Sequence, residues 1–435
     1  MKPEDISSSL DVHLDFNSLS STCEHSRIAT ILVHRRLDDP ESGSGVYLLG
    51  LIDQLARAGF EIRIILAPVT AFGSRPISRP AAIFRKKTHK ILWPDSLRIG
   101  SWFVSTRAAV WKRAIRRGLA LAHWRILRPR SPRPSFPSCL GSPLGPAEIA
   151  QLAGAANAGT SALVVAEYSS LAPVLAHCHQ GKRAVLLHDL FSLRADSFAS
   201  AGLAPDHTAV SFETEIGWLQ NADTCIYASA SEARRLSPHL PGKRHIWLPP
   251  QVRLRKVRPG GKPYAVFLGV RHAGNTDALN MLLNDVWPTV RRRLPDAELW
   301  IAGEISDDVR DAPEGVRLLG RIKDLSDIGG ADAVGLAPAR AASGISIKIA
   351  TYFELGMSVL ATPKALDGYD GRLDGLLVQA SDAADFSNKL VSLLSDPCLR
   401  EASARRGYEE ITRRIGDTGL ETYLQSLIGA AQTIA

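Results

Sequence analysis

The sequence predicts two doubly wound α/β domains that face each other across a cleft. Apolar runs rich in β-branched residues alternate with helical patterns, as expected for buried parallel strands joined by crossover helices. This alternation restarts after a Pro- and Gly-rich stretch at 251–263. The chain of 435 residues is also too long for one ordinary core.

The first domain is expected at 27–250, after a polar, Ser-rich tail at 1–26. The run 28–33 predicts a strand, 46–55 a helix that ends at Gly59, and 61–66 a second strand. Such a strand–helix–strand unit implies parallel pairing with a right-handed crossover. Further strands are predicted at 163–166, 184–187 and 225–228.

The second domain is expected at 264–413, after the linker at 251–263. Its predicted strands are 264–268, 298–302, 316–320, 333–337 and 359–362, and its predicted helices are 278–294, 348–355, 384–394 and 398–413. Trp287-Pro288 interrupts the middle of the first of these helices. A last helix, within 414–435, is expected to pack back onto the first domain.

A strongly basic segment at 70–145 interrupts the first domain. Sixteen Lys or Arg residues and a single acid, Asp95, lie between Arg75 and Arg133, which gives this window a charge of +15 and leaves −7 for the rest of the chain. Apolar residues from Val104 to Ile126 fall on one helical face, so we expect a basic amphipathic helix on an anionic membrane surface. An ordinary solvated helix packed on the domain is the alternative. Nucleic-acid binding is not expected, because no RNA- or DNA-binding module surrounds the segment. The Pro-rich residues 128–137 predict an extended exit.

Composition indicates a cytoplasmic protein, at most peripheral to a membrane. No run of about 18 apolar residues occurs, and the acidic N-terminal residues do not resemble a secretory signal. The five cysteines are scattered, which favours a reducing compartment. His177 and His179 would point to different helix faces and are interpreted as structural. No metal and no cofactor are expected.

The loop from Ser343 to Lys348 has the features of a diphosphate cradle. Gly344 allows backbone N–H groups to approach a ligand closely, and Ile345 continues the loop into a predicted helix whose N-terminus favours an anion. Lys348 adds a compact positive charge. Thr351 and Glu354 follow on the same helix. Two other loops also follow predicted strands, and they carry Arg271, for a forked phosphate contact, and Arg321, beside a nucleobase.

The order and spacing of these loops resemble the C-terminal domain of the group 1 (family 4) glycosyltransferases, which have the GT-B fold. The resemblance covers roughly 28–70 and 160–415, and it is carried by Phe267-Leu268-Gly269, Leu299–Gly303, Leu319–Ile322, Gly344–Lys348 and Gly356–Thr362. It implies that the loop before Lys348 holds the donor diphosphate and that Arg321 frames the base. One departure is evident. Thr351 stands where the family has a glutamate that grips the ribose, and Ser343 stands at the preceding acidic position. Glu354, one turn further on, is a candidate substitute.

The first domain supplies candidates for the acceptor and sugar side. The loop with Gly43 and Gly45 resembles the glycine-rich loop of the family, although a plain tight turn is the alternative. His188 and Asp189 end a predicted strand, where the family contacts the transferred sugar; a histidine satisfied by a backbone carbonyl is the alternative. Glu167 also ends a strand and is expected to line the acceptor side.

These observations predict transfer of a sugar from a UDP- or GDP-sugar to a glycan or lipid-linked acceptor, with retention of configuration implied by the resemblance, in surface polysaccharide or glycoconjugate synthesis. Lys348, Arg271 and the amides near Gly344 would stabilise the departing diphosphate, and His188 would position the sugar. The departure at Thr351 keeps a non-catalytic sugar-nucleotide-binding or partner protein open as an alternative. A nucleotide-sugar epimerase is the other alternative.

Overall fold

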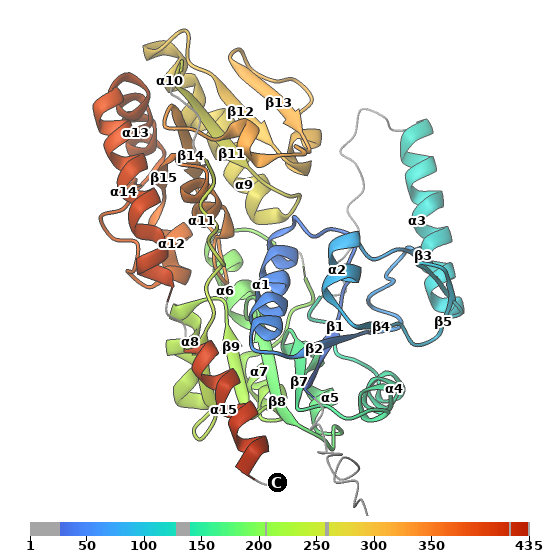
Figure 1. Cartoon of the computed structure of the whole chain (residues 1–435). Coiled ribbons are helices and arrows are strands. Elements are labelled where there is room, and N and C mark those ends of the chain that lie inside the picture. Colours follow the sequence, from blue (N-terminus) through green and yellow to red (C-terminus); the bar gives the residue numbers. More distant parts are fainter. Residues whose placement is uncertain (1–26, 128–139, 205–206, 257–260, 417–418, 434–435) are drawn as a thin grey trace, which may run out of the picture.

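The structure is a computed structural model that describes residues 27–127, 140–204, 207–256, 261–416 and 419–433. The expected tail at 1–26 and the Pro-rich exit at 128–137 lie outside these ranges. Two α/β units lie one above the other in Figure 1, with the N-terminal unit below and the C-terminal unit above.

The first unit contains a seven-stranded, entirely parallel sheet. Its strands are β1 (Ile28–Val33), β2 (Glu61–Leu66), β4 (Lys90–Leu92), β7 (Leu163–Glu167), β8 (Lys182–Leu187), β9 (Thr224–Tyr227) and β10 (Arg244–Trp247). They lie in the order β10-β9-β8-β7-β1-β2-β4, so the order reverses between β1 and β7. Such a reversal opens a crevice at the carboxyl ends of the strands.

Helices cover both faces of this sheet, which explains why its central strands are largely apolar. The helices are α1 (Gly43–Arg57), α2 (Ala82–Lys87), α4 (Pro146–Asn157), α5 (Ala172–Leu175), α6 (Phe191–Ser200), α7 (Phe212–Leu219) and α8 (Ala230–Leu236). Within β1, Ile31 packs in the same core cluster as Leu51 of α1, whereas its neighbour Leu32 packs in another cluster with Leu152 of α4. Successive side chains of one strand thus enter two different cores.

The second unit repeats this arrangement with six parallel strands. They are β11 (Tyr264–Leu268), β12 (Leu299–Ala302), β13 (Val316–Gly320), β14 (Ala333–Ala337), β15 (Ser358–Ala361) and β16 (Val378–Gln379). Their order is β13-β12-β11-β14-β15-β16, with the reversal between β11 and β14. The helices are α9 (Ala273–Met281), α10 (Trp287–Arg293), α11 (Ile347–Glu354), α12 (Pro363–Leu366), α13 (Ala383–Ser395) and α14 (Pro397–Ile415). The predicted fold of two doubly wound domains is confirmed.

The helix predicted at 278–294 is interrupted, as Pro288 requires. A π-helical turn at Leu282–Val286 joins α9 to α10, and Pro288 is the second residue of α10. Proline has no N–H, and its ring collides with the carbonyl four residues earlier. The helix therefore forms one wider, π-helical turn before Pro288. Trp287 stays fully buried through this irregularity.

The basic insertion differs from the single helix that its sequence predicts. Its antiparallel sheet consists of β3 (Ile77–Ser78), β5 (Ser96–Ile99) and β6 (Trp102–Ser105), and the helix α3 (Ala108–Leu127) follows. The expectation of a helical Val104 is therefore wrong: Val104 pairs with Leu97 across the β5–β6 hairpin. Val104 has the i, i+4 spacing to Ala108 that a helical face requires, although it lies in a strand.

The last helix, α15 (Leu420–Thr433), lies on the first unit, as Figure 1 shows. Leu420, Tyr423 and Leu424 are buried in the core cluster that also contains β1 and α1. The hydroxyl of Thr224, on β9, donates a hydrogen bond to the Tyr423 hydroxyl over 3.1 Å. The chain therefore passes through the second unit and returns to the first.

Candidate functional site

A cleft of about 1180 Å³ lies between the two units, and residues of both units line it. Its walls come from the loops that follow β8, β9, β11, β13 and β14, and from the segment before α11. These are the carboxyl ends of the strands, where open α/β sheets bind ligands. The volume is sufficient for a ligand larger than a typical drug-sized molecule.

Lys348 lies in this cleft, in the first turn of α11. Its ammonium donates a hydrogen bond to Asn275 Oδ1 over 2.8 Å and lies 4.4 Å from the centre of the Phe267 ring. Burial lowers the pKa of Lys348 from 10.5 to about 7. Among the described residues no carboxylate pairs with this ammonium, which makes it a site where an anionic ligand would relieve an unfavourable burial.

The backbone N–H groups next to Lys348 divide into two sets. The N–H of Gly344 donates to Glu232 Oε1 over 2.7 Å, and the Ser343 hydroxyl donates to the same oxygen over 2.8 Å. No described residue accepts from the N–H groups of Ile345 and Ser346, which line the cleft. The structure thus differs from the expected cradle, because one of its amides is already occupied by a carboxylate of the other domain.

Gly344 is required where this loop touches the first domain. Its φ is +70°, a value that glycine adopts without strain, and a Cβ here would lie 2.2 Å from the backbone oxygen of His188. The loop before α11 and the end of β8 therefore meet by backbone contact. This contact brings Lys348 and His188 to the walls of the same cleft.

His188 is held by a buried carboxylate that in turn pairs with an arginine. Its Nε2 lies 3.0 Å from Glu167 Oε1, and the same oxygen accepts from Arg35 Nε over 3.0 Å. Burial raises the pKa of Glu167, but Arg35 and the hydrogen bond from His188 outweigh it and bring the pKa to about 2. An ionised carboxylate can only accept, so Nε2 of His188 carries a hydrogen and Nδ1 is left as an acceptor when the ring is neutral. Tyr168 stacks on the ring, with the centroids 4.4 Å apart.

Glu167 itself is fully buried, behind His188. Its position differs from the expected one on the acceptor side of the cleft, since it orients a side chain that lines the cleft instead. Asp189 is also largely buried, lines the cleft and pairs with Arg194 over 2.7 Å.

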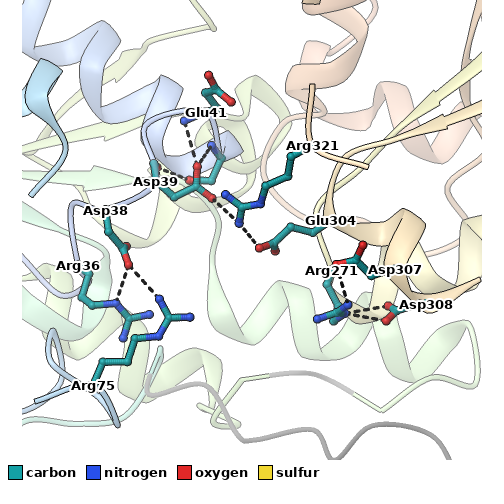
Figure 2. Close-up of polar contacts among 11 residues, drawn as sticks. Arg36, Asp38, Asp39, Glu41, Arg75, Arg271, Glu304, Asp307, Asp308 and Arg321 are labelled. Carbon is teal, nitrogen blue, oxygen red and sulfur yellow. Dashed lines mark hydrogen bonds and ion pairs between the residues drawn. The ribbon is translucent and has the colours of Figure 1, made fainter. Parts of the chain in front are cut away.

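The two predicted arginines lie at the rim of the cleft, each beside acidic residues (Figure 2). Arg271 Nε donates to Asp308 Oδ1 over 2.8 Å. Arg321 pairs with Glu304 and lies 4.0 Å from Asp39 of the first domain. A phosphate or a base would have to compete with these carboxylates, so of the three predicted cations only Lys348 lacks an acidic partner among the described residues.

The two candidates further along α11 point in different directions. Thr351 lines the cleft, and its hydroxyl donates back to the Ile347 carbonyl over 3.2 Å. Glu354 is not among the residues that line the cleft, because its carboxylate accepts from the backbone N–H of Arg253 in the linker over 2.7 Å. The structure therefore does not bring Glu354 to the place of the missing acid.

Of the two glycines in the glycine-rich loop, Gly43 lines the cleft and Gly45 does not. Gly43 is the first residue of α1 and lines the cleft. Gly45 does not line it; a Cβ at this position would lie 2.5 Å from the Asp39 carbonyl, so this glycine allows the loop to fold onto itself. The Ser42 side chain caps the helix by accepting from the Gly45 N–H over 3.2 Å.

Two residues of the site, Arg35 and Glu232, were not singled out in the sequence. Arg35 lies just beyond the end of β1, and Glu232 lies in the first turn of the helix after β9. Both positions are at carboxyl ends of strands, and a systematic inspection of charged residues at those ends would have found them.

The described residues include no group of three His, Cys, Asp or Glu side chains placed to share a metal ion. Among the same residues, no helix is both long enough and apolar enough to cross a membrane.

The arrangement of two α/β domains around a cleft agrees with the proteins to which this chain is similar. Residues 262–396 match the family described as "Glycosyl transferases group 1". No curated protein matches the sequence.

Solved structures with the same architecture span almost the whole chain. Sucrose-phosphate synthase from Thermosynechococcus elongatus is 14% identical, with a TM-score of 0.59, over 94% of this chain and 98% of its own. HepE from Anabaena, solved with UDP and glucose, is 11% identical, with a TM-score of 0.59, over 94% and 100%. A trehalose-6-phosphate protein from E. coli, bound to UDP-2-fluoro glucose, is 11% identical, with a TM-score of 0.51, over 93% and 98%. The chain therefore has the GT-B fold, and its residues 262–396 are similar to the group 1 glycosyl transferases.

Proposed function

We propose that this protein transfers a sugar, with retention of configuration, from a UDP- or GDP-sugar to a glycan or lipid-linked acceptor. The observation that carries the proposal is Lys348, a half-buried cation without an acidic partner among the described residues, beside the open amides that precede α11. A diphosphate satisfies both features at once.

In the proposed reaction, the bond between the sugar and the diphosphate breaks while an acceptor hydroxyl forms the new glycosidic bond and passes its proton to the departing diphosphate. Lys348 and the amides of Ile345 and Ser346 stabilise the negative charge that develops on the diphosphate. His188, oriented by Glu167, presents a ring nitrogen to the sugar. Contact between the domains at Gly344 excludes water, which limits hydrolysis of the donor.

The experiment compares the wild-type protein with Lys348→Ala in donor hydrolysis and in transfer to candidate acceptors. Loss of one strong electrostatic contact to a developing charge is expected to lower the rate about 100-fold or more. The cavity-lining Lys364, which pairs with Asp367, provides a matched Lys→Ala comparison at another position of the cleft. Equal rates in the wild type and in Lys348→Ala would contradict the assigned role of Lys348.

A second candidate function is favoured by Thr351. Its hydroxyl is engaged with its own helix, so the cleft lacks the acid that the family places at this position. A non-catalytic protein of the same fold would bind nucleotide sugars and convert none. Binding of nucleotide sugars without hydrolysis or transfer by the wild type would favour this candidate over the enzyme.

We also propose that the insertion binds an anionic membrane surface, which fits a lipid-linked acceptor. In Figure 1, α3 stands away from the body of the protein. Its apolar side chains are exposed rather than packed: Ile115 is 61%, Leu119 66% and Ile126 74% exposed. Only Val110 of α3 is fully buried. The surrounding Lys and Arg residues supply the charge that complements anionic lipid.

The membrane proposal is tested by sedimentation with liposomes that contain anionic lipid. Replacing Ile115, Leu119 and Ile126 with serine keeps every charge and removes the exposed apolar face, so binding is expected to fall. Leu399→Ser, at a residue that is 43% exposed in the other domain, is the control. Equal sedimentation of the triple variant and the wild type would contradict insertion of this face.

A further inference from the structure

Glu232 reaches across the cleft from the first domain to the loop before α11. It lies in the first turn of α8, where Ser229 accepts from its backbone N–H over 3.2 Å. Its carboxylate oxygen Oε1 accepts both from the Gly344 N–H and from the Ser343 hydroxyl. The residue is only 7% exposed, yet it lines the cleft.

The position of this carboxylate coincides with a departure from the family pattern. Ser343 stands where the resemblance places an acidic residue, and the structure holds the Glu232 carboxylate 2.8 Å from its hydroxyl. We propose that Glu232 supplies, from the first domain, the carboxylate that the second domain lacks at position 343, and that it binds hydroxyl groups of the donor sugar. This inference rests on the proposed function.

The geometry divides the donor between two sets of groups. Lys348 and the amides of Ile345 and Ser346 lie on the α11 side of Gly344, and they are the groups suited to a diphosphate. Glu232 contacts Gly344 itself and Ser343, which precede these groups in the chain. Since the sugar is attached to the diphosphate, a ligand whose phosphates lie against Lys348 brings its sugar toward Glu232.

The second carboxylate oxygen is available for a ligand. Both hydrogen bonds that Glu232 accepts go to Oε1, and no described residue donates to Oε2. Burial raises the pKa of Glu232 to about 8, and sugar hydroxyls that donate to Oε2 favour its ionised form, which accepts from them more strongly than a neutral group does. The bonds to Ser343 and Gly344 fix the orientation of the carboxyl group, so little conformational freedom is lost when a sugar binds.

The contact also links sugar recognition to the arrangement of the domains. The carboxylate belongs to one domain, whereas the loop that orients it belongs to the other. The complete sugar site therefore exists only while the two are together, as they are in this structure. A nucleoside diphosphate does not need Glu232, whereas a nucleotide sugar does.

The test measures calorimetric affinities for UDP and GDP and for UDP-glucose, UDP-N-acetylglucosamine and GDP-mannose. Glu232→Gln keeps an oxygen that accepts from Gly344 and Ser343 but places an NH₂ donor at the Oε2 position. We expect it to keep the affinity for the nucleoside diphosphate and to lose about tenfold or more for the preferred nucleotide sugar. Glu213→Gln, at an exposed residue of the same domain, is the matched control.

The outcomes separate this inference from the proposed function. A wild-type protein that binds none of the five compounds would contradict the proposed function itself. Unchanged nucleotide-sugar affinity in Glu232→Gln would overturn the role of Glu232 alone. An equal loss for the nucleoside diphosphate and the nucleotide sugar would also overturn it, because Glu232 would then only hold the domains together.

A relocation experiment covers the case in which the glutamine variant folds poorly. Glu232→Ala removes the carboxylate, and adding Ser343→Glu returns one to the same place from the other domain. We expect the double variant to recover part of the nucleotide-sugar affinity that Glu232→Ala loses, whereas Ser343→Glu alone sets two carboxylates against each other and weakens binding. A double variant that binds no better than Glu232→Ala would overturn the inference.

Discussion

Replacing Lys348 with methionine should stabilise the protein while removing its anion site. A pKa lowered from 10.5 to about 7 corresponds to an upper limit of about 5 kcal/mol for burying the charge. Lys348 is partly exposed to the cleft, so solvent screening reduces this figure, and loss of the hydrogen bond to Asn275 costs about 1 kcal/mol. Methionine packs well against the ring of Phe267. We expect a net gain of about 1–2 kcal/mol near neutral pH.

The gain in stability of Lys348→Met should depend on pH, and the lowered pKa of Lys348 determines the direction of this dependence. Below about pH 7 lysine is charged in both the folded and the unfolded protein, and the full cost of burial is present. Between about pH 7 and 10.5 the unfolded chain binds more protons, so the free energy of unfolding of the wild type rises and the advantage of Lys348→Met shrinks.

Thermal denaturation at several pH values measures this effect. A gain of about 1 kcal/mol raises the Tm by about 2–4 °C for a domain of this size. Lys389→Met, which removes a surface lysine paired with Asp385, is the control and should raise the Tm at no pH. A Lys348→Met variant that is less stable than the wild type near pH 6, or whose Tm difference does not change with pH, would refute the reasoning.

Two further predictions concern Glu232 and Tyr352. Burial raises the pKa of Glu232 to about 8, although hydrogen bonds from Gly344 and Ser343 partly offset it, so the free energy of unfolding should fall as pH rises from about 4.5 to about 8. Glu232→Gln should flatten the curve of Tm against pH between about pH 4.5 and 8. A curve with the same slope as that of the wild type would contradict the raised pKa of Glu232. The Tyr352 hydroxyl donates to the Leu336 carbonyl over 3.1 Å and accepts from the Leu268 N–H over 2.9 Å. Tyr352→Phe should cost about 1–3 kcal/mol in chemical denaturation, and a loss below about 0.5 kcal/mol would show that these backbone groups find other partners.

The fold could be predicted because each buried strand has its own run of apolar residues in the sequence. In β1, Ile31 and Leu32 enter cores on opposite faces, and a strand with that environment is apolar at most of its positions. The position of Lys348 was also predictable. Gly344 precedes the helix by a few residues, and a lysine in the first turn of a helix that follows a strand end lies near the ligand edge of the sheet.

The remaining features depend on contacts that no local pattern encodes. Glu232 approaches Gly344 only because the two domains meet, and the sequence does not specify their relative placement. Glu354 turns to the linker because an N–H of Arg253 lies beside it, which neither helical spacing nor composition predicts. The hairpin around Val104 is not evident in the sequence because β5 and β6 have only four residues each, too few for a strand period to be distinguished from the start of a helix.

A crystal structure of the protein with UDP or GDP bound tests the central claim most directly. We expect phosphate oxygens within hydrogen-bonding distance of the Lys348 ammonium and of the Ile345 and Ser346 amides, with the Lys348 side chain still above the Phe267 ring. A nucleotide whose phosphates bind elsewhere in the cleft, with Lys348 contacting only Asn275, would contradict the account.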